Sequence, residues 1–206
     1  SFVTSRYVSK LVAPEKWNKW PDFSFKVLEP ANAQTLYENF SQASLIAVDI
    51  ETTRVNLAIT SIAFTAVYLS GSSIPRLETC VLAIDSDFAL AWVRKFLALP
   101  AATIFQNGKY DCSYLLRYAA IPYNWKYDTA NMFHCWYSEL PKDLAMLSAF
   151  FIREGRYWKD LAASGDPYTR LEYNARDTYA TAIVACEWLL QAPQWAKTNY
   201  LQERSE

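Results

Sequence analysis

Apolar positions along the chain gather into short runs in its first half and into helically spaced stretches in its second half. Runs rich in Val, Ile, Leu and Phe that are bounded by turn residues indicate buried strands. The strands predicted in this way are Leu45–Ile50, Ile59–Leu69, Glu78–Ile84, Ala102–Phe105 and Trp125–Tyr127. A Ser-rich stretch over residues 70–75, with Gly71 and Pro75, predicts a turn between the second and third of these strands.

Apolar residues that recur every three or four positions predict amphipathic helices. The predicted helices are 31–40, 87–99, 110–118, 129–137, 144–152 and 170–190. Asp87 is the expected N-cap of the second helix, because its carboxylate can accept a hydrogen bond from a free backbone N–H there. Residues 154–167, which contain Gly155 and Gly165, are predicted to form a loop or insert.

The order of these elements predicts an α/β fold with a mixed sheet. Three strands follow one another through short connections, which indicates an antiparallel meander, and later strands alternate with helices, which indicates parallel strands joined by crossovers. Helices are then expected on both faces of the sheet. We expect one domain over residues 1–206, with an N-terminal extension (1–44), a core (about 45–190) and a C-terminal tail or linker (191–206).

Composition narrows the class of protein. The 206 residues are 52% hydrophobic with a net charge of −1, which is typical of a soluble globular protein and argues against nucleic-acid binding through a general basic field. No apolar run is long enough to cross a bilayer, so no membrane partner is expected. Four scattered cysteines and a single histidine, His134, argue against a structural zinc site. His134 is expected to be a buried or half-buried packing residue. The absence of a disulfide framework predicts a reducing compartment, cytoplasmic or nucleoid-associated.

The first predicted strand ends in two carboxylates, Asp49 and Glu51. Side chains at i and i+2 of a strand point to the same face, so both carboxylates converge on one place. Burial of ionised carboxylates costs several kcal/mol unless something compensates their charge. A hard divalent cation would do so, although an acidic pair at a solvated strand end is the simpler alternative.

Two later pairs of residues could complete such a site. Asn107 and Asp111 follow a buried strand and open a helix, where open α/β sheets place ligand groups; the alternative is that either side chain caps the helix. The same spacing recurs at 124 and 128, but that pair is predicted to run through a short strand. Tyr173 and Asp177 lie one turn apart on one face of the last helix, and the alternative there is a surface aspartate beside a core tyrosine.

Three motifs in this order resemble those of a known family. D-I-E-T at 49–52, N-G-K-Y-D at 107–111 and Y-N-A-R-D at 173–177 resemble the three exonuclease motifs of the DEDDy-type 3′–5′ exonucleases, and most closely the proofreading domains of family A DNA polymerases. Tyr173, in place of a histidine, is the mark of the "y" branch. The resemblance covers residues 45–190 and extends less specifically to the loop at 154–168, which is similar to phage-type members. Nothing in the chain resembles the polymerase part of such enzymes.

The resemblance implies an RNase H-like fold and hydrolysis of phosphodiester bonds at the 3′ end of DNA, with release of nucleoside 5′-monophosphates. It implies two Mg²⁺ or Mn²⁺ ions, the metals that oxygen-only ligands favour. Asp49 would bridge both ions, Glu51 and Asp177 would complete the first site, and Asp111 would hold the second through water. Tyr173 would orient the attacking water, since an ordinary phenol is a better hydrogen-bonding positioner than a base.

The same resemblance implies contacts to a single-stranded or frayed 3′ end of DNA through the backbone at Thr52 and the side chains of Asn107 and Tyr110. The chain begins at Ser1 rather than Met, so we expect a piece of a longer protein, with a polymerase domain in the same chain or complex and a proofreading role. Two alternatives remain at this point. One is an RNA 3′-end trimming exonuclease of the same superfamily, and the other is a non-catalytic scaffold that keeps the fold.

Overall fold

A six-stranded mixed sheet forms the centre of the computed structural model, which describes residues 20–53, 58–69, 75–152 and 158–204. The strands are β1 (Lys26–Val27), β2 (Leu45–Thr52), β3 (Ile59–Tyr68), β4 (Arg76–Ala83), β5 (Ala102–Phe105) and β6 (Trp125–Asp128). Their order is β1-β4-β3-β2-β5-β6. The pairs β2–β3 and β3–β4 are antiparallel, whereas β1–β4, β2–β5 and β5–β6 are parallel. The predicted meander with added parallel strands is confirmed.

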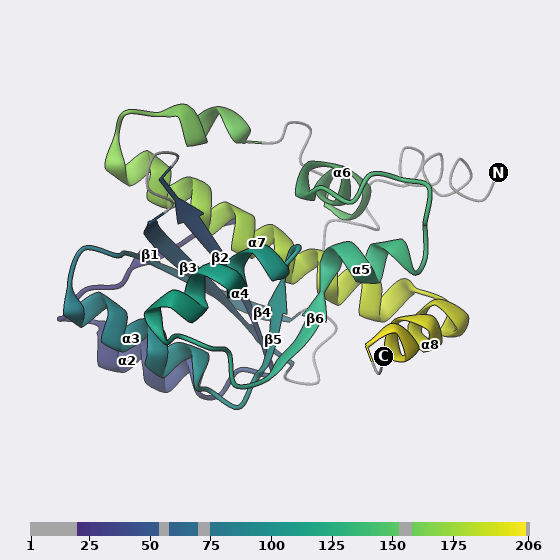
Figure 1. Cartoon of the computed structure of the whole chain (residues 1–206), viewed down its shortest axis with the longest axis horizontal. Helices are drawn as coiled ribbons and strands as arrows, with labels where there is room; N and C mark the ends of the chain where they lie inside the picture. Colours follow the sequence, from purple (N-terminus) through teal and green to yellow (C-terminus); the bar gives the residue numbers. More distant parts are fainter. Residues whose placement is uncertain (1–19, 54–57, 70–74, 153–157, 205–206) are drawn as a thin grey trace.

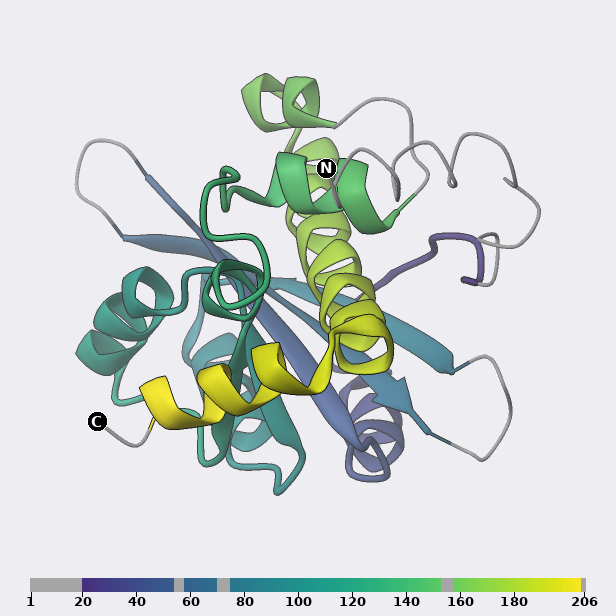
Figure 2. The same cartoon turned by 90° about the vertical axis from the view of Figure 1, so that its right-hand side faces the viewer.

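Helices cover both faces of this sheet, as predicted. They are α2 (Ala33–Phe40), α3 (Asp87–Leu97), α4 (Lys109–Leu115), α5 (Thr129–His134), α6 (Leu144–Phe151), α7 (Pro167–Gln191) and α8 (Gln194–Glu203), with 3₁₀ turns η2 (Leu116–Tyr118) and η3 (Lys159–Ala163). Helices α2 and α3 lie on one face, and the long α7 runs along the other (Figures 1 and 2). None of the helices in the described ranges combines the length and the apolar character that crossing a membrane requires.

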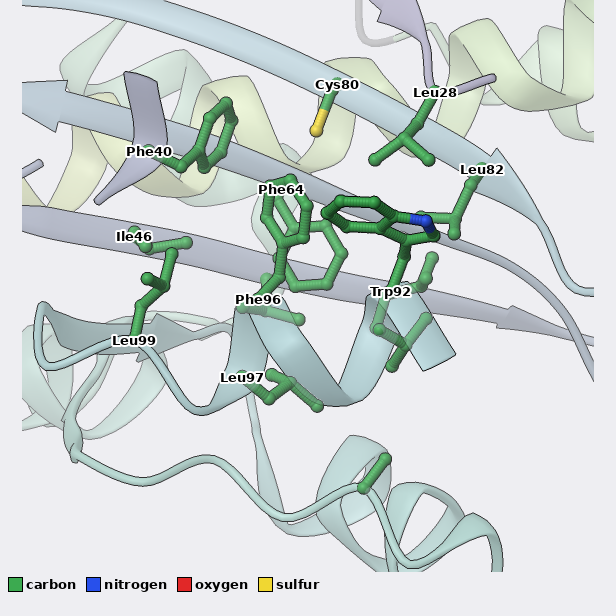
Figure 3. Close-up of a cluster of buried hydrophobic side chains, with 14 of the residues drawn as sticks. Leu28, Phe40, Ile46, Phe64, Cys80, Leu82, Trp92, Phe96, Leu97 and Leu99 are labelled. Atoms are coloured by element: carbon green, nitrogen blue, oxygen red, sulfur yellow. The ribbon is translucent and has the colours of Figure 1, made fainter. Parts of the chain in front are cut away.

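Alternation along β2 decides which side chains face α7. Ile46, Val48 and Ile50 belong to the hydrophobic cluster that contains α2 and α3, and Figure 3 shows aromatic rings of this cluster packed between the sheet and α3. Leu45 and Ala47 belong instead to the cluster that contains α5, α6 and α7. Because the side-chain period of a strand is two, the positions that follow Ala47 on the α7 face are 49 and 51.

The observed elements differ from the predicted ones in a few places. Ser86, and not Asp87, is the N-cap of α3, because the extended backbone at Ser86 lets its side chain accept from the Ala89 N–H. The expectation that His134 packs in the core is wrong, since this residue is exposed. Strand β1 was not predicted, because two residues carry no periodic pattern. The predicted turn at 70–75 and part of the loop at 154–167 lie outside the described residues.

The C-terminal region differs most from its prediction. The expected tail or linker at 191–206 contains helix α8, whose Ala196 and Tyr200 are buried. The Tyr200 hydroxyl donates to the Lys126 carbonyl at 3.1 Å and accepts from the Asp128 N–H at 2.9 Å. Two buried positions are too few to show a helical pattern in the sequence, and the apolar Trp195 and Leu201 of the same helix are exposed. This segment is therefore packed against the rest of the fold.

Candidate metal centre

Three carboxylates from β2 and α7 meet at the end of β2. Asp49, Glu51 and Asp177 each offer one oxygen, and these oxygens all lie within 4.8 Å of one another. Asp49 and Glu51 come from the α7 face of β2, and Asp177 comes from α7 and is itself buried. The sequence prediction that these three side chains converge is thus reproduced in the structure.

The fourth predicted carboxylate, Asp111, lies beside the same stretch of β2. It is 4% exposed, and its Oδ1 accepts a hydrogen bond from the Ile50 N–H at 3.2 Å. The parallel pairing of β2 with β5 explains this position, because the carboxyl ends of both strands then open at the same edge of the sheet. Helix α4 starts just after β5 and brings Asp111 back toward the residue that separates Asp49 from Glu51.

Burial and mutual repulsion make this cluster difficult to ionise. Burial, followed by the charges of Asp111, Asp177 and Glu51, raises the pKa of Asp49 well above its ordinary value. Burial, followed by the charges of Asp177 and Asp111, raises the pKa of Glu51 to about 7. Burial also raises the pKa of Asp111 to about 7, against the opposing effect of the Ile50 N–H. Carboxylates in this state need a nearby positive charge to be ionised together at neutral pH.

The donor set fits a hard divalent cation. Four carboxylates supply only oxygen ligands, the type that Mg²⁺ and Mn²⁺ prefer. Among the described residues, no cysteine and no histidine offers a ligand atom within this group of carboxylates. The positive charge of an ion would offset the burial and the repulsion that raise the pKa values of Asp49 and Glu51, and the burial that raises the pKa of Asp111.

Two neutral donors that the sequence analysis missed bind these carboxylates. The Asn174 amide donates from Nδ2 to Asp49 Oδ2 at 2.6 Å, and the indole Nε1 of Trp158 donates to Asp177 Oδ1 at 2.8 Å. Asn174 shares a helix face with Asp177, three positions away, and that spacing could have identified it. Trp158 lies in the loop at 154–168, which shares a less specific resemblance with phage-type members, and no spacing rule assigns it a contact with Asp177.

Tyr173 lies where the sequence analysis placed it, one turn before Asp177. It lines a pocket of about 300 Å³ that also includes Glu51, so the phenol and the carboxylate cluster share one opening. The pocket is formed by the end of β2, the start of β3, η3 and the first turns of α7. Its lining residues are Glu51, Thr52, Thr53, Thr60, Ser61, Ala162, Arg170 and Tyr173.

The end of β2 is irregular at the point where it meets this pocket. Its pairing with β3 shifts between Glu51 and Thr52, and the Thr60 hydroxyl donates to the Glu51 carbonyl at 3.1 Å. Such bulges redirect side chains and are frequent next to active sites. The Thr52 hydroxyl lies 2.8 Å from the hydroxyl of Tyr110, which is 46% exposed. Two of the predicted substrate-binding residues are therefore in contact with each other beside the carboxylates.

The third predicted substrate residue, Asn107, is exposed and has a positive φ of 57°. It does not cap α4, since the N-cap of that helix is Gly108, without a side-chain cap bond. The turn is held instead by Asp128, whose carboxylate accepts from the Asn107 and Gly108 N–H groups at 3.2 and 2.8 Å. Asp128 belongs to the N-x-x-x-D pair that the sequence analysis set aside, and its hydrogen bonds stabilise this turn.

Two basic residues, Lys109 and Arg176, belong to the same motifs. Lys109 is exposed. Arg176 forms an ion pair with Glu172 at 2.9 Å and lies over the ring of Phe23, 4.4 Å from its centroid.

No family model and no curated protein matches the chain. Solved structures do match it. One is Escherichia coli RNase D, an exoribonuclease involved in structured RNA processing, which is 16% identical to this chain with a TM-score of 0.58. The match covers 89% of this chain and 51% of the RNase D chain. The POL domain of Pol1 from M. smegmatis in complex with DNA primer-template and dNTP is 14% identical with a TM-score of 0.60, over 79% of this chain and 26% of its own. Brucella melitensis NrnC with bound Mg²⁺ is 16% identical with a TM-score of 0.55, over 79% of this chain and 82% of its own.

At these identities the matches establish the fold. This chain spans about half the length of RNase D and about a quarter of that of the Pol1 structure. The mixed six-stranded sheet with helices on both faces is the α/β architecture of the RNase H-like exonucleases.

Proposed function

We propose that this chain is a metal-dependent 3′–5′ exonuclease of the DEDDy type. The observation that carries the proposal is the convergence of Asp49, Glu51 and Asp177, with oxygens within 4.8 Å of one another, beside the buried Asp111. Four acidic groups in one place, of which Asp49, Glu51 and Asp111 have raised pKa values, are unfavourable for folding alone, so a role in binding cations explains why they lie together. The motif order of the sequence and the likeness in fold to RNase D support the same activity.

The chain's own residues would divide the work of hydrolysis. Asp49, Glu51, Asp177 and Asp111 would hold Mg²⁺ or Mn²⁺, and such ions stabilise the charge that develops on the attacking and leaving oxygens of a phosphodiester. Tyr173, at the wall of the adjoining pocket, would orient the attacking water by a hydrogen bond. The pocket of about 300 Å³ would receive the last nucleotide, with Thr52 and the exposed ring of Tyr110 at its edge.

We propose a single-stranded or frayed 3′ end of DNA as the substrate and proofreading for a DNA polymerase as the role. The N-x-K-Y-D motif at 107–111 and the likeness to Pol1 support this choice. The second candidate is trimming of RNA 3′ ends, favoured by the likeness to RNase D, an exoribonuclease. A polymerase partner and a cytoplasmic or nucleoid location are parts of the same proposal.

Labelled DNA and RNA oligonucleotides of one sequence, incubated with Mg²⁺ or Mn²⁺, test the activity and the choice of sugar together. We expect stepwise shortening from the 3′ end with release of nucleoside 5′-monophosphates, faster on DNA. Asp49→Ala and Asp177→Ala should abolish release while the chain stays folded, whereas Asp87→Ala, at an exposed position on α3, should leave it unchanged. Equal activity in the wild type and in both cluster variants would refute the assignment, and binding without hydrolysis by the wild type would favour a scaffold.

A further inference from the structure

We propose that Asn174 is a positioning residue of the metal centre, whose side-chain amide, supported by Ser61, fixes the orientation of the Asp49 carboxylate. This inference rests on the proposed function, because it assigns a role relative to the cation that Asp49 would hold. Neither residue belongs to the set of carboxylates and tyrosine that the motifs identify.

The three side chains form a continuous hydrogen-bonded series from β3 through α7 to β2. The Ser61 hydroxyl donates to Asn174 Oδ1 at 3.0 Å, and Asn174 Nδ2 donates to Asp49 Oδ2 at 2.6 Å. Asn174 is fully buried and Ser61 is 4% exposed, so the bond between them is shielded from water, whereas the bond to Asp49 is part-buried. The opposite orientation of the amide would direct its carbonyl oxygen at a carboxylate oxygen, so Asp49 selects the donating orientation, and the Ser61 hydroxyl then donates to Oδ1 and restrains the amide.

Small residues at the same place let α7 come close enough for this contact. Asp49 pairs with Ala63 across the β2–β3 ladder, and Glu51 pairs with Ser61. Ala63 and Ala175 are both fully buried and belong to one small cluster between the sheet and α7. A larger side chain at either position would separate α7 from the sheet. Because Asn174 is the chain neighbour of Ala175, it would then move away from Asp49.

A neutral donor suits this position better than a charged one. A lysine or arginine beside Asp49 would neutralise the carboxylate and compete with the cation for it. An amide N–H restricts rotation of the carboxylate while its negative charge remains available to an ion. Partners of this kind behind metal ligands typically contribute about 10–100-fold to metal affinity or activity.

The chain supplies a matched control one helical turn further along α7. Thr65 on β3 donates to Thr178 Oγ1 at 3.1 Å, and both residues are fully buried. This pair crosses the same interface between β3 and α7 with the same sequence separation as Ser61 and Asn174. The hydrogen bonds of these threonines join them to each other, to Thr79 and to the Ala175 carbonyl. A variant here therefore reports the structural effect of losing a buried hydrogen bond between β3 and α7.

Calorimetric titration of the full chain with Mn²⁺ tests the proposal, together with thermal unfolding and steady-state hydrolysis of a DNA oligonucleotide. Asn174→Leu keeps the side-chain volume and removes the amide, and we expect Mn²⁺ binding about 10–100-fold weaker. We expect kcat to fall with it while KM for the oligonucleotide changes little. Ser61→Ala, which removes only the support, should weaken Mn²⁺ binding by a smaller factor. Thr178→Val should lower the melting temperature yet keep wild-type Mn²⁺ affinity.

Wild-type Mn²⁺ affinity in folded Asn174→Leu and in Ser61→Ala would overturn this role while leaving the proposed function intact. An equal loss of Mn²⁺ affinity in Thr178→Val would also overturn it, because the effect would then be a general weakening of the interface between α7 and the sheet. A wild-type chain that binds no Mn²⁺ would refute the proposed function, and the positioning role with it.

Discussion

Glu51→Gln should stabilise the chain when no divalent ion is present. Burial and the charges of Asp177 and Asp111 raise the pKa of Glu51 from 4.5 to about 7. Each pH unit between the unfolded-state and folded-state pKa is worth about 1.4 kcal/mol, so the ionised glutamate lowers the free energy of unfolding by about 3 kcal/mol. Glutamine has nearly the same shape without the charge. For a chain of this length, about 3 kcal/mol corresponds to a rise of about 6–12 °C in melting temperature.

The sign and the pH window follow from proton linkage. Unfolded Glu51 loses its proton near pH 4.5, and the folded chain keeps it until about pH 7, so the folded state binds more protons between these values. Stability of the wild type therefore falls as pH rises through this interval. The advantage of Glu51→Gln should be absent below about pH 4.5 and complete above about pH 7.

Thermal or urea unfolding at pH 4.5 and pH 8 measures this difference, first with a chelator and then with Mn²⁺. A ligand present at about 1,000 times its dissociation constant stabilises a folded protein by about 4 kcal/mol. Because Glu51→Gln removes a ligand, Mn²⁺ should reverse the order of stability at pH 8. Glu29→Gln, at an exposed position before α2, is the control. Glu29→Gln should unfold as the wild type does. If Glu51→Gln also showed wild-type stability with chelator at pH 8, the reasoning about charge repulsion would be wrong.

Three other changes test separate contacts. Trp158→Phe removes the donor to Asp177 and should weaken Mn²⁺ binding several-fold in the same titration, with little effect on folding in the absence of metal. Asp128→Ala leaves the buried Gly108 N–H and the part-buried Asn107 N–H without an acceptor and should lower the free energy of unfolding by about 3 kcal/mol in urea titrations. Gly108→Ala would place a Cβ 2.5 Å from that of Phe105, so a lower melting temperature is expected, and an unchanged one would contradict this contact.

Pattern and turn chemistry predicted most of the fold, because β2, β3 and β4 are long and strongly apolar. What the pattern missed is short or polar. β1 has two residues, and α8 contributes only two buried positions, Ala196 and Tyr200. Both are held by contacts to parts of the chain far away in sequence: β1 pairs with β4, and Tyr200 bonds to the backbone around Asp128. Local periodicity carries no information on such contacts.

The site was predictable to a different extent. Spacing along β2 and α7 pairs Asp49 with Glu51 and Tyr173 with Asp177, since helix and strand periods fix which side chains share a face. That these pairs and Asp111 form one site was implied by the family resemblance. Trp158 and Ser61 reach the site only through tertiary packing, and no local rule singles them out. Asn174 is intermediate: its helix face was predictable from Asp177, whereas its bond to Asp49 depends on the close approach of α7 to the sheet.

Asp111 and Asp128 share one sequence spacing, and the source of their hydrogen bonds separates their roles. Asp128 accepts from the backbone at 107 and 108 and from the N–H groups of Ala130 and Asn131 at the start of α5, so backbone dipoles compensate its charge. Asp111 is buried and accepts from the Ile50 N–H beside two further carboxylates, and its pKa is raised to about 7. A buried aspartate whose charge the backbone compensates stabilises the fold by itself. One whose charge is only partly compensated would become more favourable with a cation bound beside it, and this difference supports the proposed place of Asp111 in the metal centre and a structural role for Asp128.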